Sequence, residues 1–323
     1  MNTLYVIGNG FDKAHEIHTD YWDFRMYLEK NHPEFLQEFE RMYNIMPLDD
    51  SEPYYTLAAQ KKWEESVDKE FWSILEGQIG YPNIAGMEDF SSCVLNDLDL
   101  ESGNVGIQDT MDWYWRQEYG FIRQLQTYLK EWISTVDLSN AKPRKVELVE
   151  NNKDYFLNFN YTETLERIYH IETVVHIHGG IGIASDVDPI IGHCNKEEIE
   201  QRRSLARKAD EVFNEGEASI QNAIADYLCE TFKDTDFIIK QHESFFKKLC
   251  AVDHVVLIGW SVGDVDVPYL CKIRDAVKKG AQWTVCYYEK NEHDTIKNTL
   301  VQNGIYKHFR VDFLQTDKYW DCK

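Results

Sequence analysis

The chain has 323 residues, 43% of them hydrophobic, which is enough to bury the core of one elaborated domain or of two. Its 34 basic and 56 acidic side chains give a net charge of −22, which would repel a phosphate backbone, so we expect no nucleic-acid partner. The sequence has neither an apolar run of roughly 18 residues nor a signal-peptide pattern, so we expect a cytoplasmic protein with no membrane partner.

The first residues predict a buried strand, a tight turn and a helix. Leu4–Ile7 is a short apolar run, and Gly8-Asn9-Gly10-Phe11-Asp12 follows it directly. A glycine turn between a parallel strand and a helix presents backbone N–H groups to a phosphate, so we infer a nucleotide pocket. Lys13 stands where the third glycine of G-x-G-x-x-G would fall, and glycine pairs also serve turns that bind no ligand.

Five more segments resemble this first strand. Most of them are short, rich in aromatic or β-branched residues, and followed by a turn or a helix start. They are Asp154–Asn160, Thr173–His178, His254–Trp260, Trp283–Tyr288 and His308–Phe313. We therefore predict an α/β fold, a doubly wound parallel sheet of about six strands, with large helical insertions.

The spacing of the strands locates these insertions. Roughly 130 residues separate the first two strands, far more than one crossover helix needs. Apolar residues at helical spacing occur there, namely Tyr21, Phe24, Tyr27 and Leu28; Trp63, Val67, Phe71 and Leu75; and Phe121, Leu125, Leu129 and Ile133. We expect a nucleotide-binding core of residues 1–20, 150–195 and 250–323, a helical insertion at 21–149 and a second one at 196–249.

One segment of the first insertion has no clear period. It runs from about Met87 to Asp109 and contains Gly103, Gly106 and several Asp and Ser residues, so we predict a loop. This loop is either a surface excursion or a lid over the pocket.

The residues directly after the strands are the candidates for a site, because ligands collect at the carboxyl ends of parallel strands. Four of these ends are unusually polar. They read Gly8-Asn9-Gly10, Asn158-Phe159-Asn160-Tyr161-Thr162, His176-Ile177-His178-Gly179-Gly180 and Gly259-Trp260-Ser261-Val262-Gly263-Asp264. We expect all four to border one crevice.

The same residues carry a family resemblance. GNGFDKAHEIHTDYWDF at 8–24, FLNFNYTETLE at 156–166, HIHGG at 176–180 and IGWSVGDVDVPY at 258–269 occur in this order. With these motifs the chain resembles the AbiH family of abortive-infection, phage-defence proteins. The resemblance spans most of the chain and implies a role in anti-phage defence.

More distantly, the order of motifs is similar to that of sirtuin-like NAD-consuming domains, whose first turn reads G-A-G-x-S. This similarity implies a sirtuin-like Rossmann fold, NAD as substrate, and catalytic roles for Asn160 and His178. Asp12 stands where that family usually carries serine, and Thr162 where its asparagine motif usually carries aspartate. The chain also lacks the zinc cysteines, which argues against a protein deacetylase.

The chemistry of glycosidic cleavage suits these two residues. Loss of nicotinamide leaves an oxocarbenium-like sugar, so the site needs a held water and a base. Asn160 is the candidate for orienting the water and His178 for accepting its proton. Each has a structural alternative, since Asn160 could cap a helix that begins near Thr162, and His178 could be a satisfied histidine at a strand end. We expect His176, inside the strand, to pack rather than react.

The remaining candidates would contact the nucleotide. They are Gly8, Asn9, Gly10, Asp12, Gly259, Ser261 and Asp264. Asp12 either caps its helix or meets a ribose hydroxyl. Ser261 and Asp264 contact a ribose or phosphate, or cap the helix that begins near Val267.

Two other functions fit parts of the pattern. Gly259–Gly263 matches G-x-S-x-G, the nucleophile elbow of a serine esterase or acyl hydrolase using Ser261. Against it, only about 60 residues follow the serine, and Asp264 and Asp266 lie too close to it to orient a separate histidine easily. A nucleotide-binding sensor that catalyses nothing is the other alternative.

We expect no metal. His176, His178 and His193 have no carboxylate at ligand spacing, and HEIH at 15–18 differs from H-E-x-x-H. Seven scattered cysteines without a C-x-x-C pair predict neither a disulfide framework nor a zinc ribbon. The expected partners are a small-molecule nucleotide and either a phage-derived trigger or a second copy of the chain.

Overall fold

The computed structural model describes residues 2–48, 55–97, 107–145, 148, 154–182 and 187–321. The chain folds into two compact units. Unit 1 comprises Met1–Phe24, Leu129–Ile190 and Asp234–Lys323, and unit 2 comprises Arg25–Tyr128 and Ile191–Lys233. Unit 1 therefore contains residues 21–24, 129–149 and 234–249, which the sequence analysis assigned to the two insertions, and unit 2 contains residues 191–195, which it assigned to the core.

Unit 1 contains a six-stranded parallel sheet, as predicted. Its strands are β1 (Thr3–Ile7), β2 (Tyr155–Asn158), β3 (Val174–His176), β4 (His254–Ile258), β5 (Gln282–Tyr287) and β6 (Arg310–Gln315). They lie in the order β3-β2-β1-β4-β5-β6, and every neighbouring pair is parallel. Each predicted strand overlaps an observed one. The inner strands β1 and β4 are buried on both faces and therefore leave continuous apolar runs in the sequence.

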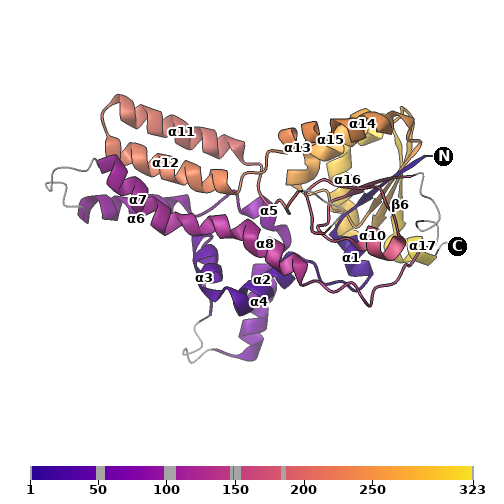
Figure 1. Cartoon of the computed structure of the whole chain (residues 1–323), viewed down its shortest axis with the longest axis horizontal. Coiled ribbons are helices and arrows are strands. Elements are labelled where there is room, and N and C mark those ends of the chain that lie inside the picture. The colour runs from indigo at the N-terminus through magenta and orange to yellow at the C-terminus, as the bar shows by residue number, and fades with distance from the viewer. Residues whose placement is uncertain are drawn as a thin grey trace. The chain divides into compact units, whose positions relative to one another are not determined.

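Helices cover both faces of this sheet (Figure 1). Leu4 and Val6 face one layer of the core and Ile7 faces the other, since successive side chains of a strand alternate. The first layer holds α13 (Thr235–Gln241), α14 (Glu243–Lys248), α15 (Val267–Ala276) and α16 (Lys290–Gln302). The second holds α1 (Asn9–Ala14), α10 (Thr164–Tyr169) and α17 (Thr316–Asp321).

Helices make up the described regular elements of the two predicted insertions, as expected. These elements lie between Tyr21 and Ser134 and between Lys196 and Glu230. They are α2 (Tyr21–Asn31), α3 (Pro33–Met42), α4 (Leu57–Glu70), η1 (Trp72–Ile74), α5 (Leu75–Gln78), α6 (Ile84–Asp97), α7 (Ile107–Tyr119), η3 (Gly120–Arg123), α8 (Gln124–Ser134), α11 (Lys196–Glu211) and α12 (Glu215–Glu230). The stripe from Trp63 to Leu75 is broken at Phe71, where the backbone leaves the helical region after α4. No described helix is both long and apolar enough to cross a membrane.

The loop prediction for residues 87–109 is wrong in its first half. Helix α6 continues to Asp97, and α7 begins at Ile107. Met87, Ser91, Val94 and Leu95 recur at helical spacing and are buried or half-buried, and the side chain of Leu95 packs against Gly216 of α12. The sequence analysis missed this helix because it considered only apolar residues, and the buried Ser91 is not one of them. Residues 107–109 begin α7, so the prediction is wrong there too, and the remaining residues 98–106 lie outside the described residues.

Candidate functional site

The order of the strands reverses between β1 and β4, so the loops after these two strands meet at the edge of the sheet where doubly wound folds bind ligands. The two loops are joined by backbone hydrogen bonds. Gly8 N donates to Ile258 O at 3.0 Å, and Gly10 N donates to Gly259 O at 2.9 Å. These two N–H groups are thus directed at β4 and its loop.

The same contact explains the glycines of both loops. A Cβ on Gly8 would lie 2.5 Å from Gly259 O, and a Cβ on Gly259, whose φ is +63°, would lie 2.3 Å from Phe11 N. Only glycine permits backbones to approach this closely and adopts this φ without strain. The close approach accounts for Gly8, Gly10 and Gly259 without a ligand, and their contact with a nucleotide stays a prediction.

Asn160 follows β2 and is tied to the β1 turn. Its side-chain Nδ2 donates to Gly8 O at 3.1 Å, and its backbone N–H donates to Asn158 Oδ1 at 3.0 Å. The proposed alternative, a cap of the next helix, does not hold, since α10 begins at Thr164 with Glu163 at its N-cap and no capping side chain. Asn160 is therefore a buried link between the ends of two neighbouring strands.

Asp12 is fully buried and joins α1 to the segment before α10. Its carboxylate accepts hydrogen bonds from the hydroxyls of Thr162 at 2.6 Å and Thr164 at 2.7 Å. Burial raises the pKa of Asp12, and the hydroxyl donors oppose that rise in part. Asn9, nearby in α1, accepts a hydrogen bond from the Thr19 hydroxyl at 2.6 Å. The Asp12 carboxylate thus binds side chains of this chain rather than capping α1, whose N-cap is Gly8.

His178 follows β3 and faces the loop after β4. Its Nε2 lies 3.6 Å from Asp266 Oδ1, and the imidazole is buried. Asp266 is held in turn by Trp260, whose Nε1 donates to Asp266 Oδ2 at 2.8 Å. His178 and Asp266 therefore form a buried acid–imidazole pair.

Aromatic rings surround this pair and connect it to β2. The rings of Phe159 and His178 form a T-shaped pair with 5.0 Å between centroids, and Phe159 stacks on Trp260 at 4.5 Å. Because Phe159 immediately precedes Asn160, the two predicted catalytic residues lie at the ends of neighbouring strands on one edge of the sheet.

Sequence reasoning missed the roles of Trp260 and Asp266. Both lie in the motif after β4, and Asp266 was considered only as a partner for Ser261. The signal available was a Trp and an Asp six residues apart at a strand end. Nothing in that spacing indicates that the partner of Asp266 is a histidine at the end of β3.

His176 occupies the end of β3 itself. Its Nε2 lies 2.7 Å from Glu166 Oε1, and its Nδ1 lies 3.2 Å from the carbonyl of Asn160. These contacts fit the packing role expected for His176, and they fix the backbone of Asn160 from behind.

Ser261 does not have the surroundings of an elbow nucleophile. It is exposed, and the non-glycine residue of this loop with a positive φ is Val262, at +53°, rather than Ser261. The 3-10 turn η5 (Asp264–Asp266) separates it from α15, whose N-cap is Asp266 without a side-chain hydrogen bond. In the described ranges no histidine hydrogen-bonds to Ser261, so the geometry gives the acyl-hydrolase hypothesis no support. The exposed Ser261 and Asp264 do not cap α15 and remain candidates for ligand contact.

Two other histidines, His15 and His193, are held by hydrogen bonds within the fold. His15 hydrogen-bonds to Phe11 O and the Tyr169 hydroxyl. His193, in unit 2, accepts from Asn195 N on Nδ1, which leaves Nε2 to donate to Leu228 O. Burial lowers the pKa of His193 to about 4, so it is neutral at physiological pH.

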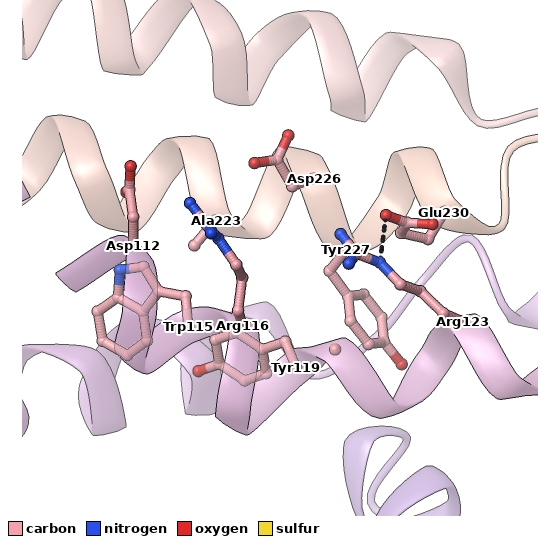
Figure 2. A pocket seen from close by; sticks show the side chains of 10 residues that line it. Asp112, Trp115, Arg116, Tyr119, Arg123, Ala223, Asp226, Tyr227 and Glu230 are labelled. Carbon is pink, nitrogen blue, oxygen red and sulfur yellow. Dashed lines mark hydrogen bonds and ion pairs between the residues drawn. The ribbon is translucent and has the colours of Figure 1, made fainter. Parts of the chain in front are cut away.

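Unit 2 has a pocket of about 110 Å³ between α7, η3 and α12. Figure 2 shows Arg116 and Arg123 extending toward α12, where Arg123 forms an ion pair with Glu230 at 2.8 Å. Trp115, Tyr119 and Tyr227 supply aromatic walls. No residue predicted from the sequence to bind or react lines this pocket.

Comparison with known proteins adds one finding. Residues 4–287 match a family model described as Bacteriophage abortive infection AbiH. The matched range includes all four motifs of the sequence analysis. No curated protein and no solved structure matches the chain, so the similarity to sirtuin-like domains is not confirmed.

Proposed function

This chain belongs to the AbiH family of bacteriophage abortive infection proteins, and we propose that in this role it hydrolyses NAD, or a related nucleotide, at the glycosidic bond. One observation carries the proposal. Asn160 binds the β1 turn through Gly8, and His178 faces Asp266 of the β4 loop, so an amide, an imidazole and a carboxylate occupy the carboxyl edge of the sheet. That edge, where the strand order reverses, is the ligand-binding edge of doubly wound folds.

The proposed reaction is a substitution at the anomeric carbon. The C1′–N bond breaks and its electron pair neutralises the pyridinium ring, so nicotinamide leaves without needing an acid. A water oxygen bonds to C1′ and loses a proton to the base. Because the leaving group is already good, positioning the water and the ribose supplies much of the catalysis.

His178 is the proposed base. Its imidazole would take the water proton, and Nε2 is the nitrogen that faces Asp266. Asp266 stabilises the imidazolium that forms, and the Trp260 hydrogen bond keeps Asp266 in place. Asn160 orients the water or a ribose hydroxyl.

Recognition of the nucleotide falls to side chains rather than to the glycine amides. The N–H groups of Gly8 and Gly10 are already hydrogen-bonded within the protein. We therefore assign contacts with the phosphates and riboses to Asn9, Ser261 and Asp264, which are half-buried or exposed. Depletion of the cytoplasmic nucleotide would then arrest an infected cell, with a phage-derived trigger or a second copy of the chain as activator.

The test is the release of nicotinamide from NAD, followed by chromatography, with the wild type and the Asn160→Ala and His178→Ala variants. We expect release by the wild type and its loss in both variants. His254→Gln is the matched control, because His254 begins β4 at the opposite edge of the sheet, hydrogen-bonds to Thr284 and has no assigned role in the reaction. It should keep the activity.

The same proteins are assayed in infected cells, where any trigger is present. NAD should fall in cells that carry the wild type and stay constant with Asn160→Ala. Constant NAD in wild-type cells that still resist phage overturns the proposal. Ester cleavage that disappears only in Ser261→Ala would favour the acyl hydrolase, and tight nucleotide binding without turnover would favour the sensor.

A further inference from the structure

The turn between α11 and α12 exposes two apolar side chains. The two helices lie side by side in unit 2 (Figure 1), and Val212-Phe213-Asn214 connects them. The exposed fraction is 71% for Val212 and 92% for Phe213. No other large apolar side chain in the described part of the chain is as exposed as Phe213.

The backbone at Phe213 is also unfavourable for its side chain. Its φ is +59°, and Asn214 N donates to Ala209 O at 2.9 Å, which is the pattern of a helix end that normally has glycine at this position. A bulky residue is disfavoured in this left-handed region because of its Cβ. Neither conformation nor burial therefore explains a phenylalanine here.

The turn does not need the phenyl ring to form. Asn214 caps α12 by accepting a hydrogen bond from Glu217 N, and the backbone bonds that end α11 involve no side chain. The ring is thus available for a contact outside this chain, and exposed apolar surface of this kind marks interaction sites.

Carboxylates surround the two apolar residues. Asp210, Glu211 and Glu215 are exposed and form no ion pair with any residue that the structure describes. Together with Glu217 they place four acidic residues within four positions of Phe213. We call these four carboxylates the acidic rim of the turn. The acidic rim repels nucleic acid and anionic lipid, and it also repels a second copy of this chain, whose net charge is −22.

We propose that this turn, Asp210–Glu217, is a docking element for a basic protein. The phenyl ring of Phe213 would enter an apolar pocket of the partner, and lysines or arginines around that pocket would meet the carboxylates. The rim would speed the encounter and select the partner by charge, while the buried ring would supply most of the affinity. This inference does not depend on the reaction proposed above.

The test separates docking from folding. Phe213→Gly removes the ring and relieves the left-handed backbone, so the protein should unfold at the same or a higher temperature. Protection of cells against phage, measured by plaque counts, should fall at least about tenfold, as expected when a central interface side chain is lost. Phe213→Leu should retain most protection, and Glu211→Lys with Glu215→Lys should lose it.

Phe237→Ala is the matched control. Phe237 is another phenylalanine, 56% exposed, in α13 of unit 1. Its loss should change neither stability nor protection. Full protection by Phe213→Gly overturns the proposal.

A photo-crosslinking residue, p-benzoylphenylalanine, placed at position 213 tests the partner directly in infected cells. We expect an adduct with a basic protein, identified by mass spectrometry, that disappears in the Glu211→Lys and Glu215→Lys background. A crosslink to a second copy of the chain, or to an acidic protein, overturns the proposal.

Discussion

The hydrogen bond between Asp12 and Thr162 joins two positions that are 150 residues apart, and exchanging its donor and acceptor tests the geometry of the site. We predict that Asp12→Ser and Thr162→Asp each destabilise the protein, and that the double variant recovers much of the loss.

The magnitude follows from burial. Asp12→Ser removes an acceptor of two hydroxyl hydrogen bonds, at 2.6 and 2.7 Å, and hydrogen bonds to charged groups are worth about 1.5–3 kcal/mol each. Relief of the desolvation that raises the pKa of Asp12 offsets part of this loss, so we expect about 2 kcal/mol. Thr162→Asp places two carboxyl groups in contact at a buried position, so one must stay protonated at neutral pH, at a cost of about 4 kcal/mol.

The assay is urea unfolding of the four proteins of this cycle at neutral pH. In the double variant, the serine at position 12 would donate a hydrogen bond to the aspartate at position 162. One acid and one hydroxyl side chain would then again face each other, with their positions exchanged. The losses of the single variants sum to about 6 kcal/mol, and the double variant should lose about 3, a coupling energy of about 3 kcal/mol. Near pH 4 the Thr162→Asp variant should recover stability relative to the wild type, because its extra carboxyl is then protonated without cost.

A double variant as unstable as the sum of its parts would refute this reasoning. Asp12→Ser combined with Thr284→Val provides the control, since Thr284 lies on β5, two strands from β1. Those two effects should add to within about 0.5 kcal/mol.

Three further predictions concern single positions. The folded-state pKa of His193 is lowered by burial to about 4, so its contribution to stability is complete above pH 6.5 and is lost as the pH falls toward 4. The destabilisation caused by His193→Gln should therefore shrink by about 3 kcal/mol between about pH 7 and pH 4 in urea unfolding, and a constant difference would contradict the assigned neutral ring. Gly259→Ala should cost about 1–3 kcal/mol more than Gly280→Ala, because both have a positive φ but only the first would place a Cβ against backbone, and equal melting temperatures would show that the two loops are not in contact. Asp266→Asn should lower kcat for nicotinamide release about tenfold or more with little change in KM, whereas Asp264→Asn should raise KM, and the reverse pattern would exchange the roles given to these two acids.

Local sequence was sufficient for the six strands of the sheet and for the edge on which the candidate residues lie. The run Leu4–Ile7 and its turn predicted β1 and α1, because burial on both faces and a glycine turn are properties of neighbouring residues. Helix α6 was missed because its buried face includes Ser91, which an apolar pattern does not register. The role of Asp266 was missed because its partner is an imidazole at the end of another strand, which a local pattern does not indicate.

The sequence by itself determined that polar residues follow four buried strands, and this is enough to place Asn160 and His178 on one edge of a parallel sheet. Only the tertiary structure decided what those residues touch: that the amides of Gly8 and Gly10 bind the β4 segment, that Asp12 holds Thr162, and that Asp266 faces His178. The physical reason is that strand propensity depends on residues a few positions apart. A hydrogen bond across the sheet depends on the order in which distant strands pair. The sequence around the residues that form the bond does not indicate that order.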